Sequence, residues 1–291
     1  MSLIEASVIV PHYNDLEGLD SCLAALEQQS FPRDRFEIIV ADNASPCGPD
    51  AVRAVVGDRA RVVFVHEKGA GPARNGGVAA STGEILAFTD SDCTPDADWL
   101  ASGIARLADA GFVGGRMVVS LPRRTLTPPE AFEAVFAFDN QFYVERKAFT
   151  VTANLFVRRA DFLAVGPFRT NVSEDQDWCM RARAHGLVIA YAHAAVVHHP
   201  PRHSWEELFS KWRRVIAEQH AITVERTGGL LIWLARTWLV LPSIPVHAIQ
   251  ILGSKRLQTR PDRMAALHGL VRLRLWRFVQ AHRVMLRQDN R

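Results

Sequence analysis

The N-terminal half of the chain alternates short apolar runs with segments of helical period, and this alternation restricts the fold to few classes. The apolar runs are Ala6–Pro11, Phe36–Ala41, Arg61–Val65, Glu84–Thr89 and Phe112–Val119. The helical segments between them are Glu17–Gln29, Pro49–Val56, Pro72–Ser81 and Asp96–Ala108. Strands that are apolar on both faces and alternate with helices predict an α/β fold, with a mainly parallel central sheet flanked by helices.

Beyond Leu121 the alternation weakens. The pattern predicts a breaker-rich connection, then helices and strands in turn: a connection at 122–129, a helix at 129–147, a strand at 151–157, a helix at 177–185 that ends at Gly186, and strands at 188–191 and 194–198. From Ser204 onward the pattern is helical almost throughout. Residues 1–201 hold 18 Lys and Arg against 25 Asp and Glu, whereas residues 202–291 hold 16 against 6. This change of sign predicts a domain boundary near Pro200–Pro201.

The overall composition sets the class of protein. With 291 residues, of which 48% are hydrophobic, the chain has enough apolar material for a large core, which excludes disorder as its overall state. The four cysteines form no C-x-x-C pair, and the N-terminus has neither the basic start nor the apolar run of a secretory signal. We therefore expect free thiols in a reducing compartment and a cytoplasmic location.

Polar residues follow three of the predicted strands. The strand ends are Pro11-His12-Tyr13-Asn14, Ala41-Asp42-Asn43-Ala44-Ser45 and Thr89-Asp90-Ser91-Asp92. In open parallel sheets ligands bind beyond the carboxyl ends of the strands, so these residues are the first candidates for a site. Two carboxylates separated by one small residue can hold a hard divalent cation, although an Asp- and Ser-rich sequence is also common in a solvated turn.

The segment Gly69–Gly77 is rich in glycine and precedes the strand that ends in Asp90. Glycine-rich backbone entering a helix can approach phosphate oxygens, and Arg74 could pair with them; the alternative is a flexible turn with a surface arginine. The segment is not a G-x-x-x-x-G-K-[ST] loop, and no G-x-G-x-x-G follows the first strand. These sequence differences argue against a P-loop nucleotidase and a dinucleotide-binding dehydrogenase.

Two further groups of residues could carry chemistry. Glu174, Asp175 and Asp177 lie at a predicted helix start, where acids either cap the helix or serve as a general base if the fold brings them opposite Asp90-Ser91-Asp92. For Asp177, a capping or structural role is at least as good an explanation as a role in catalysis. His198 and His199 follow a short apolar strand and either complete a metal site or are ordinary surface and packing residues.

Together these motifs resemble the GT-A glycosyltransferases, specifically glycosyltransferase family 2. The resemblance covers about residues 4–200, and the order and spacing of its motifs make it specific. It rests on Ser7–Asn14, with the P-x-Y-N end of the opening strand, Ile39–Ser45, the stretch Gly71–Asp92 that ends in D-x-D, Glu174–Asp177, which matches E-D-x-D, and Val197–His199.

The resemblance implies a GT-A fold, in which a Rossmann-like, mainly parallel sheet is flanked by helices. It assigns residues 1–201 to the catalytic domain, with a nucleotide-sugar-binding half at 1–120 and an acceptor and catalytic half at 121–201. Residues 202–291 then form a helical, basic C-terminal extension. Members of the family invert the anomeric centre by direct displacement.

The resemblance also implies roles for individual residues. Asp42 would contact the donor base, and Asp92, assisted by Asp90, would hold Mn²⁺ or Mg²⁺ against the donor diphosphate. His198 or His199 would bind the metal or the leaving diphosphate, while Asp175, next to Glu174, would deprotonate the acceptor hydroxyl. The remaining donor-nucleotide residues would be Pro11, His12, Tyr13, Asn14, Arg74, Asn75 and Ser91.

Three departures qualify this transfer. Asn43 replaces the second acid of the family's usual D-D pair, and Gly166–Arg169 reads G-P-F-R in place of G-x-F-D, which affects the acceptor side. The Q-x-x-R-W motif of processive polysaccharide synthases is absent from the sequence, and Lys211–Arg214 is only faintly similar to it. We therefore expect transfer of a single sugar rather than polymer synthesis.

The C-terminal region combines apolar and basic segments. Residues 229–252 are strongly apolar, but Arg236, Pro242, Pro245 and His247 interrupt them and disfavour a spanning helix. Residues 255–291 hold ten Lys and Arg against two Asp, interleaved with apolar and aromatic side chains. This pattern suits contact of residues 229–291 with an anionic membrane surface. Equally, it suits a helical hairpin packed on the catalytic domain or in a homodimer interface. Nucleic acid has no supporting motif.

The sequence thus predicts an inverting, metal-dependent glycosyltransferase that moves one sugar from a nucleotide-diphospho-sugar to a glycan or polyprenyl-linked acceptor. Its expected location is the cytoplasmic face of the cell membrane, as a peripheral protein. One alternative is a nucleotidyltransferase that makes an activated sugar, but the lysine-containing glycine-rich signature expected after the first strand is not at Pro11–Asn14. A second alternative is a non-catalytic GT-A scaffold that binds a membrane or a partner.

Overall fold

The computed structural model describes residues 4–170, 172–225 and 227–288, which form two compact units. The first unit contains the described residues of 1–118 and 138–199, and the second those of 119–137 and 200–288. The predicted boundary near 200 therefore coincides with a change of unit. The prediction placed residues 119–137 in the N-terminal domain, but the structure places them in the second unit. They include a helix whose apolar face packs among the C-terminal helices.

The first unit is built on an eight-stranded sheet whose order is β3-β2-β1-β4-β7-β6-β8-β5. Strands β3, β2, β1 and β4 run parallel, β7 is antiparallel to both β4 and β6, and β5 is antiparallel to β8. The mainly parallel α/β sheet is therefore confirmed. The strands are β1 (Ala6–His12), β2 (Phe36–Asp42), β3 (Arg61–Phe64), β4 (Ile85–Phe88), β5 (Thr94–Pro95), β6 (Phe112–Val119), β7 (Leu155–Arg158) and β8 (Ile189–His199).

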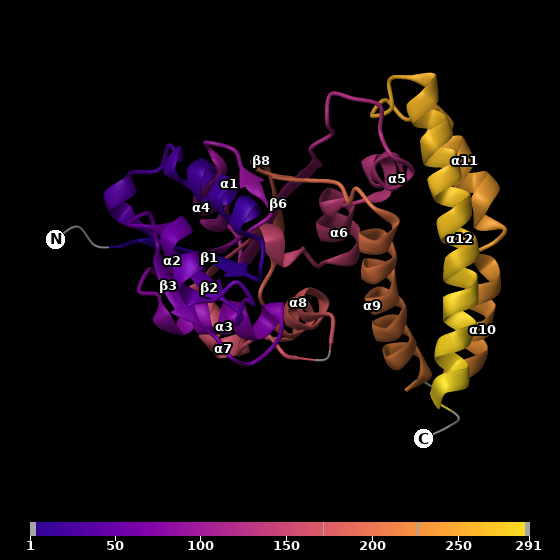
Figure 1. Cartoon of the computed structure of the whole chain (residues 1–291). Coiled ribbons are helices and arrows are strands. Elements are labelled where there is room, and N and C mark those ends of the chain that lie inside the picture. The colour runs from indigo at the N-terminus through magenta and orange to yellow at the C-terminus, as the bar shows by residue number, and fades with distance from the viewer. Residues whose placement is uncertain (1–3, 171, 226, 289–291) are drawn as a thin grey trace. The chain divides into compact units, whose positions relative to one another are not determined.

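Helices cover both faces of this sheet (Figure 1). Successive side chains of a strand point to opposite faces, so Val8 and Val10 pack in one core with α1 and α4, while Ile9 packs in a second core with α3, α7 and α8. This division explains why β1 carries buried residues on both of its faces. The helices are α1 (Leu16–Glu27), α2 (Pro49–Val56), α3 (Ala70–Ala80), α4 (Trp99–Leu107), α6 (Asn140–Lys147), α7 (Arg159–Val165) and α8 (Glu174–Ala184).

A glycine sets the distance between α3 and the sheet. A Cβ atom added to Gly77 would lie 2.6 Å from Ile9 Cγ2 of β1, closer than carbon atoms approach without a shift. Only glycine therefore lets α3 lie this close to β1. The close packing holds the N-terminal turn of α3, which carries Arg74, beside the carboxyl ends of the parallel strands.

Several predicted elements differ from the structure. The helix predicted at 129–147 is two helices, α5 (Pro128–Phe136) and α6, because Ala137 is extended, Phe138 has a φ of 26°, and Asp139 caps α6 by accepting a hydrogen bond from Phe142 N. The strands predicted at 188–191 and 194–198 form the single strand β8. The strand predicted at 151–157 is a 3₁₀ turn, Thr152–Asn154, followed by β7.

The second unit is helical, which confirms the predicted helical C-terminal region. It contains α5, α9 (Trp205–Val224), α10 (Gly229–Leu239), α11 (Ser243–Gly253) and α12 (Arg260–Gln288) (Figure 1). Its core is made by apolar residues of α5, α9, α11 and α12, among them Phe132, Leu208, Ile251, Leu270 and Leu273.

A buried acid with two basic partners joins α5 to the start of α9 within this unit. Glu133, 1% exposed, lies 2.9 Å from Lys211 Nζ and 2.9 Å from Arg202 Nη1, and Arg202 N donates to it at 2.8 Å. Burial alone would raise the pKa of Glu133, but the charges of Lys211 and Arg202 outweigh it and lower that pKa to about 2.

We predict that the Glu133 carboxylate makes the stability of the protein depend on pH. Because its pKa is lowered in the folded state, its contribution is fully present above about pH 4.5 and is lost as the pH falls toward 2. The full contribution is on the order of 3 kcal/mol. Glu133→Gln should lower the free energy of unfolding by urea at pH 7, and the difference from wild type should shrink at pH 3.5. Glu206→Gln, on the exposed first turn of α9, is the matched control. A difference that is the same at both pH values would contradict the assignment.

Candidate active site

The carboxyl ends of β1, β2 and β4 lie side by side, because β1 pairs in parallel with both neighbours. A cleft of about 260 Å³ opens there, also bordered by the first turn of α3. Among its lining residues are seven that the sequence predicted as site residues, namely Pro11, His12, Tyr13, Arg74, Asp90, Ser91 and Asp92. The structure thus brings these seven residues to one cleft, and their functional roles stay predictions. Asp15, Asn43, Ala70 and Ala73 also line the cleft and were not among the predicted residues.

His12 and Asp42 form a buried pair at one wall of the cleft. His12 Nδ1 lies 2.8 Å from Asp42 Oδ1, and Asp15 N donates to His12 Nε2 at 3.2 Å. Since Nε2 accepts, Nδ1 carries the proton and donates to Asp42. Ser45 donates to the same carboxylate through its hydroxyl and, at 3.1 Å, through its backbone N–H. Asp42 is 1% exposed and lies behind the lining, so its direct contact with a donor base stays a prediction.

The amide of Asn43 holds the loop that leads into α3. Its Nδ2 donates to Val65 O at 3.1 Å and to Glu67 O at 2.6 Å, and its Oδ1 accepts from Gly69 N at 2.7 Å. An aspartate could not make the two donations. Asn43 is therefore more than a tolerated replacement of the family's second acid, and the sequence alone gave no signal for this role.

Two predicted donor residues make contacts away from the cleft lining. Asn75 pairs with the backbone of Phe168, donating to its carbonyl at 2.8 Å and accepting from its N–H at 2.9 Å. Asn14 is exposed, and its N–H donates to Ser45 Oγ at 2.8 Å. A role of Asn14 or Asn75 in donor binding stays a prediction.

Arg74 is the charged centre of the site. It is 3% exposed and forms ion pairs with Asp90 and, at 3.1 Å, with Glu174 Oε1. Asp90 follows β4, and Glu174 begins α8, so this guanidinium brings the D-S-D turn and the acidic cluster together. Burial opposes the charged form of Arg74, but Asp90 and Glu174 outweigh it and raise its pKa. With Asp90 engaged by Arg74, a metal contact of Asp90 stays a prediction.

The three acids of α8 have different surroundings. Asp177 accepts from Arg181 Nε at 2.9 Å, an i,i+4 pair that supports the structural interpretation of this residue. Asp175 accepts from Ser173 Oγ and from Gln176 N, each at 2.8 Å. Burial raises the pKa of Asp175, and the neighbouring charge of Glu174 raises it further against the effect of these hydrogen bonds. A carboxylate with a raised pKa is a better proton acceptor than an ordinary one.

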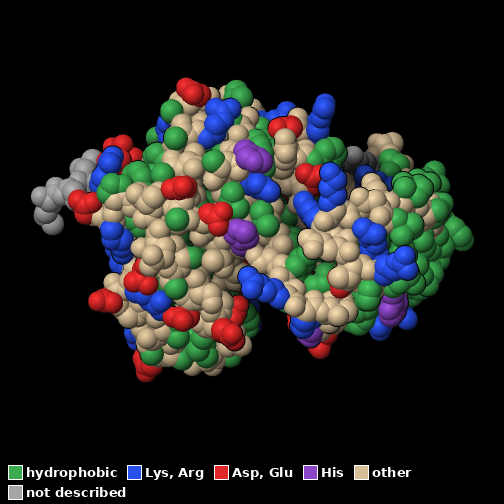
Figure 2. All heavy atoms as spheres, turned by 90° about the horizontal axis from the view of Figure 1, so that it is seen from above, with side chains coloured by type: hydrophobic (Ala, Val, Ile, Leu, Met, Phe, Trp, Pro, Cys, Tyr) green, Lys and Arg blue, Asp and Glu red, His purple; other side chains and the backbone are tan. Residues whose placement is uncertain are grey.

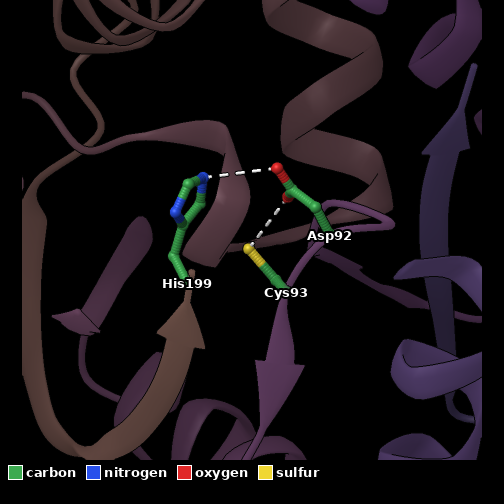
Figure 3. A group of neighbouring side chains, drawn as sticks. All are labelled: Asp92, Cys93 and His199. Atoms are coloured by element: carbon green, nitrogen blue, oxygen red, sulfur yellow. Dashed lines mark hydrogen bonds and ion pairs between the residues drawn. The ribbon is translucent and has the colours of Figure 1, made fainter. Parts of the chain in front are cut away.

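Asp92, Cys93 and His199 converge on one point (Figure 3). Their ligand atoms lie within 4.8 Å of one another, with His199 Nε2 3.3 Å from Asp92 Oδ2 and Cys93 Sγ 3.5 Å from Asp92 Oδ1. A carboxylate and an imidazole at this separation can hold a divalent cation. Burial raises the pKa of the Cys93 thiol well above its usual value.

The register of β5 and β8 distinguishes the two histidines. Thr94 lies opposite His198, and the antiparallel register continues to place His199 by Cys93, next to Asp92. His198 points elsewhere, with Nε2 3.0 Å from Asp96 Oδ1. The sequence left the choice between His198 and His199 open, and the structure brings only His199 to Asp92. Cys93 and Asp96 were not predicted, although both lie within four residues of the D-S-D motif.

Comparison with known proteins agrees with this arrangement. The model of the family described as glycosyl transferase family 2 matches residues 7–166. The glycosyltransferase AglE of Haloferax volcanii is 31% identical over 250 residues, which are 81% of this chain and 82% of that protein. The chain belongs to glycosyl transferase family 2. A pre-mycofactocin glycosyltransferase of Mycobacterium tuberculosis is 27% identical over 68% of this chain and 43% of its own length.

Solved structures confirm the GT-A fold of this family 2 glycosyltransferase. The mannosyltransferase PcManGT from Pyrobaculum calidifontis, in complex with GDP-Man and Mn²⁺, has a TM-score of 0.56 and 20% identity over all of this chain and 76% of its own. Residues 1–349 of S. aureus TarS, in complex with UDP-GlcNAc, have a TM-score of 0.55 and 18% identity over 91% of this chain and 89% of theirs.

We predict that Asn43→Asp destabilises the protein, although an acid is the usual residue at this position in the family. The carbonyls of Val65 and Glu67 would lose their donor and face a negative charge, at a cost of about 1–3 kcal/mol. Urea denaturation measures the loss. Asn14→Asp, an exposed position whose contact is made by its backbone, serves as the control and should change little. Equal stability of Asn43→Asp and wild type would show that the amide does not hold the loop.

Proposed function

We propose that this glycosyltransferase inverts the anomeric centre with the help of a divalent cation. It moves one sugar from a nucleotide-diphospho-sugar to a hydroxyl of a glycan or lipid-linked acceptor, at the cytoplasmic face of a membrane. The observation that carries the proposal is the double ion pair of Arg74. It joins the cleft at the strand ends to the helix that carries Asp175, so the donor site and the proton acceptor belong to one arrangement.

The cleft suits the anionic donor. The first turn of α3 borders it at Ala70 and Ala73, and no side chain caps this helix. The positive end of the helix dipole favours phosphate oxygens at this position. Tyr13, 59% exposed at the rim, offers an aromatic face to the base. The donors bound to the solved neighbours, GDP-Man and UDP-GlcNAc, belong to this chemical class.

Asp92 and His199 are the residues that would hold the cation. Bound there, Mn²⁺ or Mg²⁺ would supply positive charge to neutralise the departing diphosphate. Mg²⁺ prefers an all-oxygen shell, so the imidazole of His199 favours Mn²⁺. PcManGT was solved with Mn²⁺, which supports the same choice.

Asp175 is the proposed base, and Glu174 helps to place it. The raised pKa of Asp175 lets its carboxylate accept the proton of the acceptor hydroxyl as that oxygen attacks the anomeric carbon. The bond to the diphosphate breaks in the same displacement, which inverts the anomeric centre. Glu174, fixed by Arg74, keeps the first turn of α8 in place and adds negative charge beside Asp175.

We predict that one nucleoside diphosphate raises the melting temperature in a Mn²⁺-dependent way. Wild type is measured with UDP, GDP, dTDP and CDP, each with and without Mn²⁺. A ligand at 100 times its Kd stabilises the folded state by about 2.7 kcal/mol. Asp92→Ala should abolish the metal-dependent part of the shift. Asp96→Ala, which removes the partner of His198 only, should retain it. A metal-dependent shift of equal size in Asp92→Ala would overturn the metal assignment.

We predict that Asp175→Asn retains the nucleotide shift but loses turnover by 10²–10⁴-fold, the usual contribution of a general base. Turnover is measured with the donor selected above, as transfer of radiolabelled sugar to a membrane extract and as release of nucleoside diphosphate. Asp177→Asn, in the Arg181 pair, is the matched control and should remain active. Full activity of Asp175→Asn would exclude this residue as the base. Binding without turnover in wild type would favour a non-catalytic scaffold.

A further inference from the structure

Helices α10 and α11 of the second unit expose a large apolar surface. Leu231 is 73% exposed and Ile249 is 72% exposed. Figure 2 shows the hydrophobic side chains gathered on this part of the unit. We call this surface the apolar face; its exposed residues are Leu230, Leu231, Ile232, Trp238, Leu239, Val246, Ile249 and Leu252. Exposed apolar areas of this kind mark interaction sites.

The opposite sides of α10 and α11 pack against other helices of the second unit. In α10, Trp233 is buried and donates to Ala281 O of α12 at 3.2 Å, and in α11, Ile251 is buried in the core with Leu270 and Leu273. The two helices therefore keep one side on the helical unit and turn the other outward. This arrangement fits helices that lie along a surface, since a spanning helix would have to leave the unit.

The lengths of the helices agree with this arrangement. No single helix among the described residues is long and apolar enough to cross a membrane; α10 and α11 pass that test only as a pair, which is bent by 49°. Each has 11 residues and so measures about 16 Å, against about 30 Å for the hydrocarbon core of a bilayer.

The chain next to the apolar face is basic. Residues 237–254 contain no Asp, Glu, Lys or Arg, and Lys255, Arg256, Arg260 and Arg263 follow directly. The one acid in residues 255–263 is Asp262. Both oxygens of its carboxylate accept hydrogen bonds within the unit, Oδ1 from Leu126 N at 2.9 Å and Oδ2 from Thr259 Oγ1 at 2.5 Å.

A cavity of about 670 Å³ lies at this basic end, and its lining includes Arg123, Arg124 and Arg256 together with Thr259 and Asp262. Arg124 pairs with Glu130 at 2.7 Å. Arg256 donates to the carbonyl of Ala134 at 3.2 Å, and neither it nor Arg123 has a carboxylate partner among the residues that the structure describes. Guanidinium groups with free donors bind phosphate oxygens well.

We propose that α10 and α11 lie in the plane of an anionic bilayer, with the apolar face inserted below the headgroups and Arg123 and Arg256 on lipid phosphates. This inference rests on the proposed function for its membrane location and adds the segment, the orientation and the lipid charge. A second copy of the chain could cover the apolar face but would not account for the basic residues beside it. Anionic lipids match both the apolar face and its charge.

The test measures co-sedimentation of the full chain with vesicles of phosphatidylcholine alone and with phosphatidylglycerol added. Wild type should bind the anionic vesicles, and alkaline carbonate should release it, as expected for an in-plane helix pair. The double variant Leu231→Glu and Ile249→Glu should weaken binding to the anionic vesicles at least 10-fold, because moving a carboxylate into the hydrocarbon core has a high free-energy cost. The matched control is Leu163→Glu with Val188→Glu, two residues of the first unit that are 63% and 70% exposed. It should bind like wild type.

The arginines give a separate readout. Arg123→Gln with Arg256→Gln should remove most of the preference for phosphatidylglycerol and its dependence on salt. Arg146→Gln, an exposed arginine of α6 in the first unit, is the control. Inorganic phosphate at millimolar concentration should not release wild type from the vesicles, whereas release would indicate a site for free phosphate.

Three outcomes would overturn the proposal: no binding of wild type to either vesicle, equal binding of the Leu231 and Ile249 variant, or resistance to carbonate. A dimer in sedimentation equilibrium that this variant dissociates would assign the apolar face to a second copy. The nucleotide shift is measured on the same samples, so failure of the donor site and failure of membrane docking are seen separately.

Discussion

The arrangement of the site depends on the buried guanidinium of Arg74. Burying one charge is costly unless the geometry of its partners is good, and Arg74 offsets this cost with two carboxylates, Asp90 and Glu174. These partners are far apart in the sequence, so one side chain fixes the end of β4 relative to the start of α8. Its Nε is also buried and has no hydrogen-bond partner among the described residues.

The strands and the edge of the sheet that carries the site could be predicted from the sequence because they depend on local pattern. Runs such as Ala6–Pro11 are apolar except for Ser7, as expected for a strand that is buried on both faces. The break between α5 and α6 could not be predicted in this way. The apolar pattern continues through Ala137 and Phe138, and the chain turns there because α5 packs in the second unit and α6 belongs to the first.

The partners of individual site residues were harder to predict than the location of the site. Sequence motifs placed His198 and His199 near the metal, but only the register of β5 with β8 shows which of them meets Asp92. From the sequence, Asn43 was only a replacement for the second acid of the family's D-D pair, and the structure shows its three hydrogen bonds to the 65–69 loop. Such contacts depend on tertiary geometry that a single sequence does not contain, so motif reasoning finds a site more reliably than it assigns roles within it.

The charge asymmetry of the chain now has a physical interpretation. In the first unit, Asp90 and Glu174 pair with Arg74, Asp92 lies beside His199, and burial raises the pKa of Asp175. In the second unit, the few acids serve the fold, as Glu133 does between Lys211 and Arg202, and Arg123 and Arg256 are left without carboxylate partners among the described residues. The proposed donor chemistry thus rests on carboxylates, and the proposed membrane contact rests on arginines and exposed apolar residues. Because the two proposed surfaces use different residues and different forces, each proposal can be tested by mutations that leave the other surface unchanged.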